Sequence, residues 1–180
     1  MSYNVIIGID NGVSTGGLCA ISAHNGAIIA TLAMPWAKYK SRKEVCIQFA
    51  NAWFLSVAGD NLQRALFVIE EPNNSRNAST AYSVASCFHS FRGYFIANNL
   101  TFLRITPQSW QKKMLGKVPK GETKNYALAS AKERWPDDSF TKSSRSTKPH
   151  TGIVDAALIA EYGRLTLTNK STNKSTNETK

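Results

Sequence analysis

Alternating blocks of apolar and polar residues divide the chain into expected strands and helices. Residues 4–9, "NVIIGI", form a continuous apolar run that ends at Asp10 and a following Asn-Gly pair. Such a run is typical of a buried central strand. Apolar segments bounded by turn residues predict four more strands, at 16–22, 26–34, 64–70 and 100–106.

Helical spacing of apolar residues separates and follows these strands. Over 41–60 the apolar residues recur at helical intervals, and Ser41 with Glu44 three residues later forms a capping box. This pattern predicts a helix that begins at Ser41. Four more helices are expected at 77–99, 107–116, 123–135 and 151–167.

The order of these elements predicts one α/β domain. Three strands, a helix, a strand, a helix, a strand and further helices indicate a mixed sheet with helices covering its faces. We assign this domain to residues 1–167, a length that can bury a substantial core. Residues 168–180 repeat "TNKS" without a single hydrophobic residue, so we expect a disordered polar tail there.

The distribution of charge indicates what kind of partner the protein binds. The chain has 22 Lys and Arg against 12 Asp and Glu, a net charge of +10. Residues 104–148 contain eleven basic and four acidic residues, so this quarter alone contributes +7. Clustered positive charge of this kind indicates a nucleic-acid-binding surface rather than a merely soluble basic one.

The remaining composition indicates a cytoplasmic protein. Cys19, Cys46 and Cys87 are far apart and form no CxxC pair, which favours free thiols in a reducing compartment. No apolar run approaches the roughly 18 residues of a membrane span, and the N-terminus lacks the pattern of a secretory signal. We therefore expect no membrane association.

Three acidic residues interrupt apolar stretches. Asp10 ends the first strand, Glu70 ends the fourth, and Asp155 lies near the start of the last helix, among Ile153, Val154 and three alanines. Buried carboxylates need a proton, a partner or a metal. If the fold brings the three together, their hard oxygen ligands predict Mg²⁺, or Mn²⁺ in its place, as in two-metal phosphodiester hydrolysis. Glu71 points to the opposite face from Glu70, and the strand pattern alone does not choose between them.

Five motifs in order resemble a known family. "IGIDNGVSTGG", "VIEEP", "ITPQSWQKKMLG", "KGETKNYALASAKERWP" and "HTGIVDAALIAEYG" are similar to motifs of the RuvC-like Holliday junction resolvases, closest to those of bacteriophages and some bacteria. The resemblance covers about residues 4–165. It implies a ribonuclease H-like fold with a five-stranded mixed sheet, and a homodimeric, Mg²⁺-dependent endonuclease that acts on four-way or other branched DNA in the bacterial cytoplasm. The family's acids fall on Asp10, Glu70 and Asp155.

One position departs from the resemblance. Related sequences commonly have an acid where this chain has Thr151, one helical turn before Asp155. A threonine hydroxyl would be a weak metal ligand there, and Thr151 is equally suited to be the N-cap of the last helix. Other relatives use a histidine in this region, which makes His150 a candidate fourth catalytic residue.

The resemblance and the charge pattern also suggest which residues contact DNA. Arg76, in the polar loop "NNSRNAST", is a candidate for a phosphate or base-step contact. In the family, the helix that corresponds to 77–99 helps to form the dimer. Five lysines within thirteen residues are candidates for phosphate contacts: Lys112, Lys113, Lys117, Lys120 and Lys124.

Two other functions fit parts of the pattern. A DNA-binding relative that has lost cleavage would keep the fold and the charge, and only Thr151 favours it. An actin-like ATPase or sugar kinase also begins with a strand and a Gly-rich turn like "IGIDNG". That class needs a second such domain, which 180 residues cannot supply.

Overall fold

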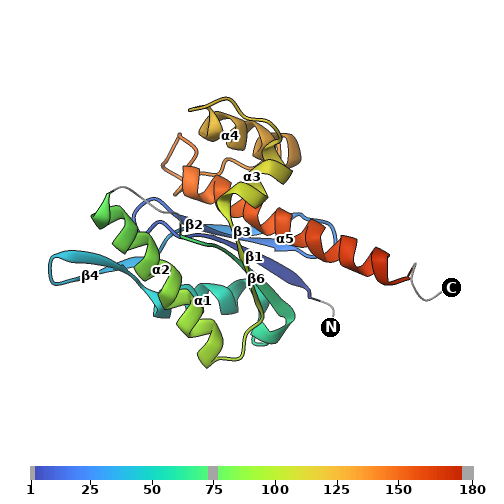
Figure 1. Cartoon of the computed structure of the whole chain (residues 1–180). Helices are drawn as coiled ribbons and strands as arrows, with labels where there is room; N and C mark the ends of the chain where they lie inside the picture. Colours follow the sequence, from blue (N-terminus) through green and yellow to red (C-terminus); the bar gives the residue numbers. More distant parts are fainter. Residues whose placement is uncertain (1–2, 73–76, 176–180) are drawn as a thin grey trace.

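The computed structural model describes residues 3–72 and 77–175, and its centre is a mixed five-stranded sheet. The strand order is β3-β2-β1-β6-β7 (Figure 1). The predicted α/β class and the five predicted strands are confirmed. The strands are β1 (Val5–Asp10), β2 (Gly17–Ser22), β3 (Ile28–Ala33), β6 (Ala65–Glu70) and β7 (Phe102–Ile105).

Strand directions bring two strand ends to one edge of the sheet. β1 is antiparallel to β2, and β2 to β3, whereas β1 and β6 are parallel, as are β6 and β7. Ile9 of β1 pairs with Ile69 of β6. The residues that follow, Asp10 and Glu70, therefore end adjacent strands at the same edge.

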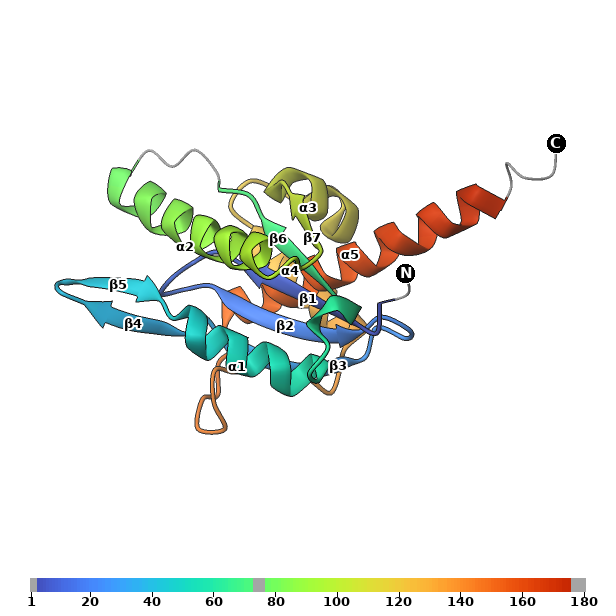
Figure 2. The same cartoon turned by 90° about the horizontal axis from the view of Figure 1, so that it is seen from below.

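Helices cover both faces of the sheet, as Figures 1 and 2 show. One face packs against α1 and α2 through a cluster that includes Phe54, Phe67 and Phe95. The other face packs mainly against α5, with α3 and α4 outside it. The helices are α1 (Ile47–Ala58), the short 3₁₀ helix η1 (Leu62–Arg64), α2 (Ala78–Ala97), α3 (Pro107–Leu115), α4 (Thr123–Arg134) and α5 (Thr151–Ser175).

The predicted helix start at Ser41 is wrong. Residues 42–45 form a strand, β5 (Arg42–Val45), which pairs with β4 (Trp36–Tyr39) in a separate hairpin. Glu44 does not cap a helix, because its carboxylate accepts a hydrogen bond from the Ser86 hydroxyl (3.1 Å). α1 begins only at Ile47, after Cys46. Cross-strand pairing and contact with α2 override the local helix signal here.

The end of the last helix also differs from the prediction. α5 begins at Thr151 as expected but continues past Leu167 to Ser175. It thus enters the segment for which the sequence predicts a polar tail. Residues 176–180 lie outside the described part of the chain, so the tail itself, and the division at 167, stay predictions.

Small residues let α5 lie directly on β1. A Cβ atom on Gly8 would lie 2.0 Å from the carbonyl oxygen of Ala156 and 2.5 Å from the backbone nitrogen of Ala160. Neither backbone group can move without displacing the helix. The absence of a side chain at Gly8 therefore sets the distance between helix and sheet.

We expect Gly8→Ala to destabilise the protein by about 1–3 kcal/mol or more, because the added methyl group overpacks the helix–sheet contact. Urea unfolding would measure the change. Gly93→Ala is the matched control: Gly93 lies in α2 with nothing within 4 Å of its Cβ position, so this change should stabilise by roughly 0.5–1 kcal/mol. Equal effects of the two substitutions would contradict the close contact.

Candidate active site

Two glycine contacts bring the start of α5 to the sheet edge where Asp10 and Glu70 lie. Gly152, in the first turn of α5, forms a bridge with Gly16 in the turn between β1 and β2. A Cβ on Gly152 would lie 2.1 Å from the carbonyl oxygen of Thr15. Because Gly17 pairs with Asp10, this contact places Asp155, one turn further along α5, beside the same edge.

The pKa values of all three acidic side chains are raised. Burial raises the pKa of Asp10 well above its usual value, and the charges of Asp155 and Glu70 raise it further. Burial, followed by the charge of Glu70, raises the pKa of Asp155 to about 7, although Lys124 opposes this shift. Burial also raises the pKa of Glu70, against a hydrogen bond from Trp110 that lowers it. The structure thus brings Asp10, Glu70 and Asp155 into one poorly solvated cluster, which favours a proton or a cation between them.

Glu71 lies apart from this cluster. Its carboxylate is 3.6 Å from Nε of Arg104, in a partly exposed ion pair. The charges that act on Asp10 are those of Asp155 and Glu70. Of the two adjacent glutamates between which the strand pattern could not choose, Glu70 is the one that faces the other carboxyl groups.

Two residues that the sequence did not single out complete this edge. Nε1 of Trp110, at the first turns of α3, donates a hydrogen bond of 2.5 Å to Oε2 of Glu70 and fixes that carboxylate. Asn11 donates through Nδ2 to the backbone oxygen of Glu70, and its buried Oδ1 has no hydrogen-bond partner within the described residues. Both stand in motifs quoted above, "ITPQSWQKKMLG" and "GIDNG", but burial and geometry were needed to identify them.

The donor set fits a hard divalent cation. Carboxylate oxygens and an amide oxygen are the ligands that Mg²⁺ and Mn²⁺ prefer. The Oδ1 of Asn11, which has no partner among the described residues, and the raised pKa values of Asp10 and Asp155 both indicate groups that a cation would stabilise. Within residues 3–72 and 77–175, however, no three His, Cys, Asp or Glu side chains are close enough to enclose an ion as they stand.

Thr151 and His150 lie at the entrance to α5. The carbonyl oxygen of His150 accepts the backbone N–H groups of Ile153 and Val154, so His150 occupies the N-cap position. The interpretation of Thr151 as N-cap is therefore wrong: Thr151 is the first helical residue. Its exposed side chain lines a cavity of about 250 Å³ together with Asp155 and Lys124.

His150 has a different electrostatic neighbour. Its Nδ1 is buried without a hydrogen-bond partner in the described part of the chain. Burial, followed by the positive charge of Lys142, lowers its pKa. The carboxyl groups of Asp10, Glu70 and Asp155 are not among the charges that shift it, and a catalytic role for His150 stays a prediction.

The lysines of the predicted DNA-binding cluster divide into three groups. Lys112, Lys117 and Lys120 are exposed on α3 and the following loop. Lys113 lies against α5, with Nζ 5.1 Å from the ring centroid of Tyr162 and 3.4 Å from Oγ1 of Thr166. Lys124 faces the cavity beside Asp155. Arg76 lies outside the described residues.

The fold is similar to that of solved RuvC structures. No family model and no curated protein matches the sequence. Solved structures do match: RuvC of T. thermophilus in complex with a Holliday junction substrate aligns with a TM-score of 0.54 and 14% identity, over 91% of this chain and 96% of that one. A second Thermus thermophilus RuvC structure aligns with a TM-score of 0.48 and 15% identity, over 89% of this chain and 96% of that one.

The structural likeness to RuvC confirms, at the level of the fold, the resemblance seen in the motifs. The mixed sheet with the order β3-β2-β1-β6-β7 is consistent with the expected ribonuclease H-like fold. Among the described residues, no helix is both long and apolar enough to cross a membrane.

Without metal, the carboxyl cluster should make stability depend on pH. The pKa of Asp155 is raised in the folded protein, so the folded state holds this proton more tightly than the unfolded chain does. The stability that depends on the proton is fully present below pH 4 and is lost as the pH rises through about 7. In EDTA, Asp155→Asn should therefore be more stable than the wild type at pH 8 by about 1–4 kcal/mol, since one pKa unit corresponds to roughly 1.4 kcal/mol. The difference should disappear near pH 4.

Chemical denaturation at both pH values would measure this effect. Asp60→Asn is the control for the loss of one negative charge, because Asp60 is exposed just after α1. A pH-independent effect of Asp155→Asn would mean that Asp155 is solvated rather than gathered with the other two acids.

Proposed function

We propose that this protein is a metal-dependent endonuclease that cleaves four-way junctions and other branched DNA. The observation that carries the proposal is the convergence of Asp10, Glu70 and Asp155 at one sheet edge. Burial raises the pKa of all three, and the charges of the neighbouring acids raise the pKa of Asp10 and Asp155 further. Its fold, the net charge of +10 and the likeness to a RuvC bound to a Holliday junction support the choice of substrate.

Each residue of the site has a distinct task. Asp10, Glu70 and Asp155 hold Mg²⁺, with Mn²⁺ able to substitute, and Trp110 keeps the Glu70 carboxylate oriented through its indole N–H. The buried Oδ1 of Asn11 offers a further oxygen. The bound metal supplies Lewis-acid activation of water and stabilisation of the phosphate charge. Lys124, beside Asp155, attracts the phosphate that is to be cut.

Binding of the branched substrate uses a wider surface and a second subunit. Lys112, Lys117 and Lys120 contact phosphates, as does Arg76, whereas Lys113 supports α5. A homodimer places two sites on the two strands to be cut, since a two-fold assembly matches a symmetric junction. Exposed Tyr82 and Ile96 on α2 support an interface there. The protein acts in the cytoplasm of a bacterial cell.

The central test is cleavage of a labelled four-way junction in Mg²⁺. Asp10→Asn, Glu70→Gln and Asp155→Asn should each lower cleavage by about 100-fold or more, while junction binding measured in EDTA survives, because basic residues supply the affinity. Glu71→Gln is the matched control and should retain activity. An inactive Glu71→Gln beside an active Glu70→Gln would exchange the roles of the two glutamates.

A branched-DNA-binding relative with impaired cleavage is the second candidate. The observation that favours it is Thr151, whose hydroxyl lines the cavity beside Asp155 where a related chain would present a carboxylate. Such a protein would keep the DNA-binding surface and cleave slowly or only at high Mg²⁺.

Thr151→Asp tests this second candidate. The added carboxylate should lower the Mg²⁺ concentration needed for cleavage several-fold without tightening junction binding, because hard cations bind more tightly as carboxylates are added. His150→Ala should leave cleavage largely unchanged, since the charge that shifts the pKa of His150 is that of Lys142 and not those of the three acids. A silent Thr151→Asp together with an inactive His150→Ala, in the same Mg²⁺ titration, would move His150 into the site.

A further inference from the structure

The β4–β5 hairpin projects from the protein at the edge that carries the carboxyl cluster. Gly17 pairs with Asp10 on one side and with Ala33 on the other, so β3 ends level with Asp10. The hairpin starts at Trp36, directly after this edge. Figures 1 and 2 both show it extending beyond the sheet at the end of the molecule where α2 begins.

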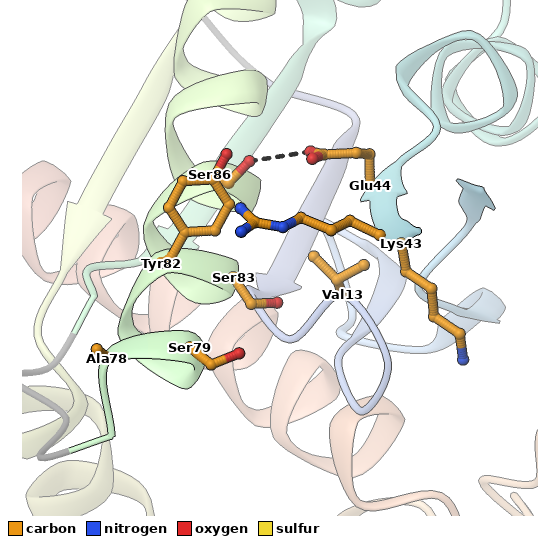
Figure 3. Close-up of a pocket in the computed structure, with 9 residues that line it drawn as sticks. Val13, Lys43, Glu44, Ala78, Ser79, Tyr82, Ser83 and Ser86 are labelled. Atoms are coloured by element: carbon orange, nitrogen blue, oxygen red, sulfur yellow. Dashed lines mark hydrogen bonds between the residues drawn. The ribbon is translucent and has the colours of Figure 1, made fainter. Parts of the chain in front are cut away.

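One face of the hairpin is occupied by α2. In an antiparallel pair, directly opposite residues lie on the same face, so Tyr39 and Arg42 share a face with Glu44. Arg42 lies 5.0 Å from the ring centroid of Tyr82, and Glu44 accepts a hydrogen bond from Ser86. Figure 3 shows Glu44 pointing toward Ser86 on α2. These contacts fix the orientation of the hairpin.

The opposite face, which we call the outer face, carries positive charge that forms no ion pair with any residue in the described part of the chain. Lys38 and Lys43 are exposed and lie directly opposite each other across the two strands. Like charges in such a pair destabilise a hairpin. Figure 3 shows Lys43 pointing away from α2. Natural proteins keep such an unfavourable pair mainly at functional sites. A negatively charged ligand bound to Lys38 and Lys43 would offset their repulsion.

Aromatic rings lie beside these lysines. Trp36, on the outer face, is 43% exposed, and Phe49 of α1 is 58% exposed. Both line an open cavity of about 290 Å³ at the base of the hairpin, together with Lys142. Nζ of Lys43 lies 4.1 Å from the ring centroid of Trp36. Exposed rings combined with cations are the means by which proteins bind unpaired strands, through base stacking and phosphate contacts.

We propose that the outer face of the β4–β5 hairpin binds an unpaired strand of branched DNA. Lys38, Lys43 and Lys142 contact its phosphates, and one base enters the cavity and stacks against both Trp36 and Phe49, which line it. Paired bases are already stacked and would leave these rings unused, which favours an unpaired strand over a duplex arm. A second copy of the chain would bring the same positive charges against Lys38 and Lys43, so repulsion disfavours it as the occupant.

This inference deepens the proposed function and rests on it, but its test is separate from cleavage. Binding of the full-length chain is measured in EDTA by fluorescence anisotropy. The probes are a fully paired four-way junction, the same junction with a single-stranded flap, and a linear duplex. We expect the wild type to prefer the flapped junction.

Trp36→Ala and Phe49→Ala should each weaken binding to the flapped junction by about five-fold or more, because stacking of one base is worth at least about 1 kcal/mol. Binding to the linear duplex should not change. Lys38→Ala with Lys43→Ala should lower the log–log salt slope for the flapped junction by about 1.4, since each single-strand phosphate contact contributes roughly 0.7. Phe49 and the lysines are exposed, so these variants should fold even if Trp36→Ala does not.

Arg64→Ala with Arg134→Ala removes the same charge from exposed positions away from both the hairpin and α2, and serves as the control. Hairpin variants that bind the flapped junction no worse than this control would overturn the proposal. So would equal losses on flapped junction and duplex, or variants that only change the sedimentation of the chain, which would make the outer face a contact between copies. A wild type that binds the flapped junction but does not cleave it in Mg²⁺ would contradict the proposed function alone.

Discussion

The close approach of α5 to the strand edge is the constraint on which the site depends. Gly8 lets α5 lie on β1, and Gly152 lets the first turn of α5 contact Gly16 in the turn between β1 and β2. A side chain at either position would meet backbone atoms, which cannot turn aside as a flexible side chain can. The helix is therefore held where Asp155 lies near the half-buried Asp10 and Glu70, despite the unfavourable electrostatics. The packing of α5 against β1 and the β1–β2 turn thus offsets the repulsion among the three acids.

The cluster in turn explains the polar contacts around it. Trp110 is almost wholly buried, yet its indole N–H reaches Glu70, so α3 contributes to both the core and the site. Thr106, the N-cap of α3, accepts a hydrogen bond from the backbone of Ser109, and Pro107 follows it at the first helical position. This cap fixes where α3 begins, and hence where Trp110 lies. The cap and the proline are visible in the sequence, but the hydrogen bond that they help Trp110 to make with Glu70 is visible only in the structure.

The sequence predicted the central sheet well because its strands are continuous apolar runs, which local physics makes nearly unambiguous. It failed at 41–46, where a capping box suggested a helix but Glu44 pairs across a hairpin and bonds to Ser86. The acids Asp10, Glu70 and Asp155 could be singled out because each interrupts an apolar stretch. Asn11 and Trp110 could not, since polar and aromatic residues are common at such positions. The sequence could not choose between Glu70 and Glu71, because it does not specify which face of the strand is turned toward the other acids.

Direct measurement of metal binding tests the central claim, that the three acids act together on a divalent cation. Isothermal titration of Mn²⁺ into the DNA-free protein near pH 8 separates this claim from every question about the substrate. We expect saturable binding by the wild type and by Glu71→Gln, and loss of binding in Asp10→Asn, Glu70→Gln and Asp155→Asn. Binding that persists unchanged in Asp10→Asn, or that disappears in Glu71→Gln, would contradict it.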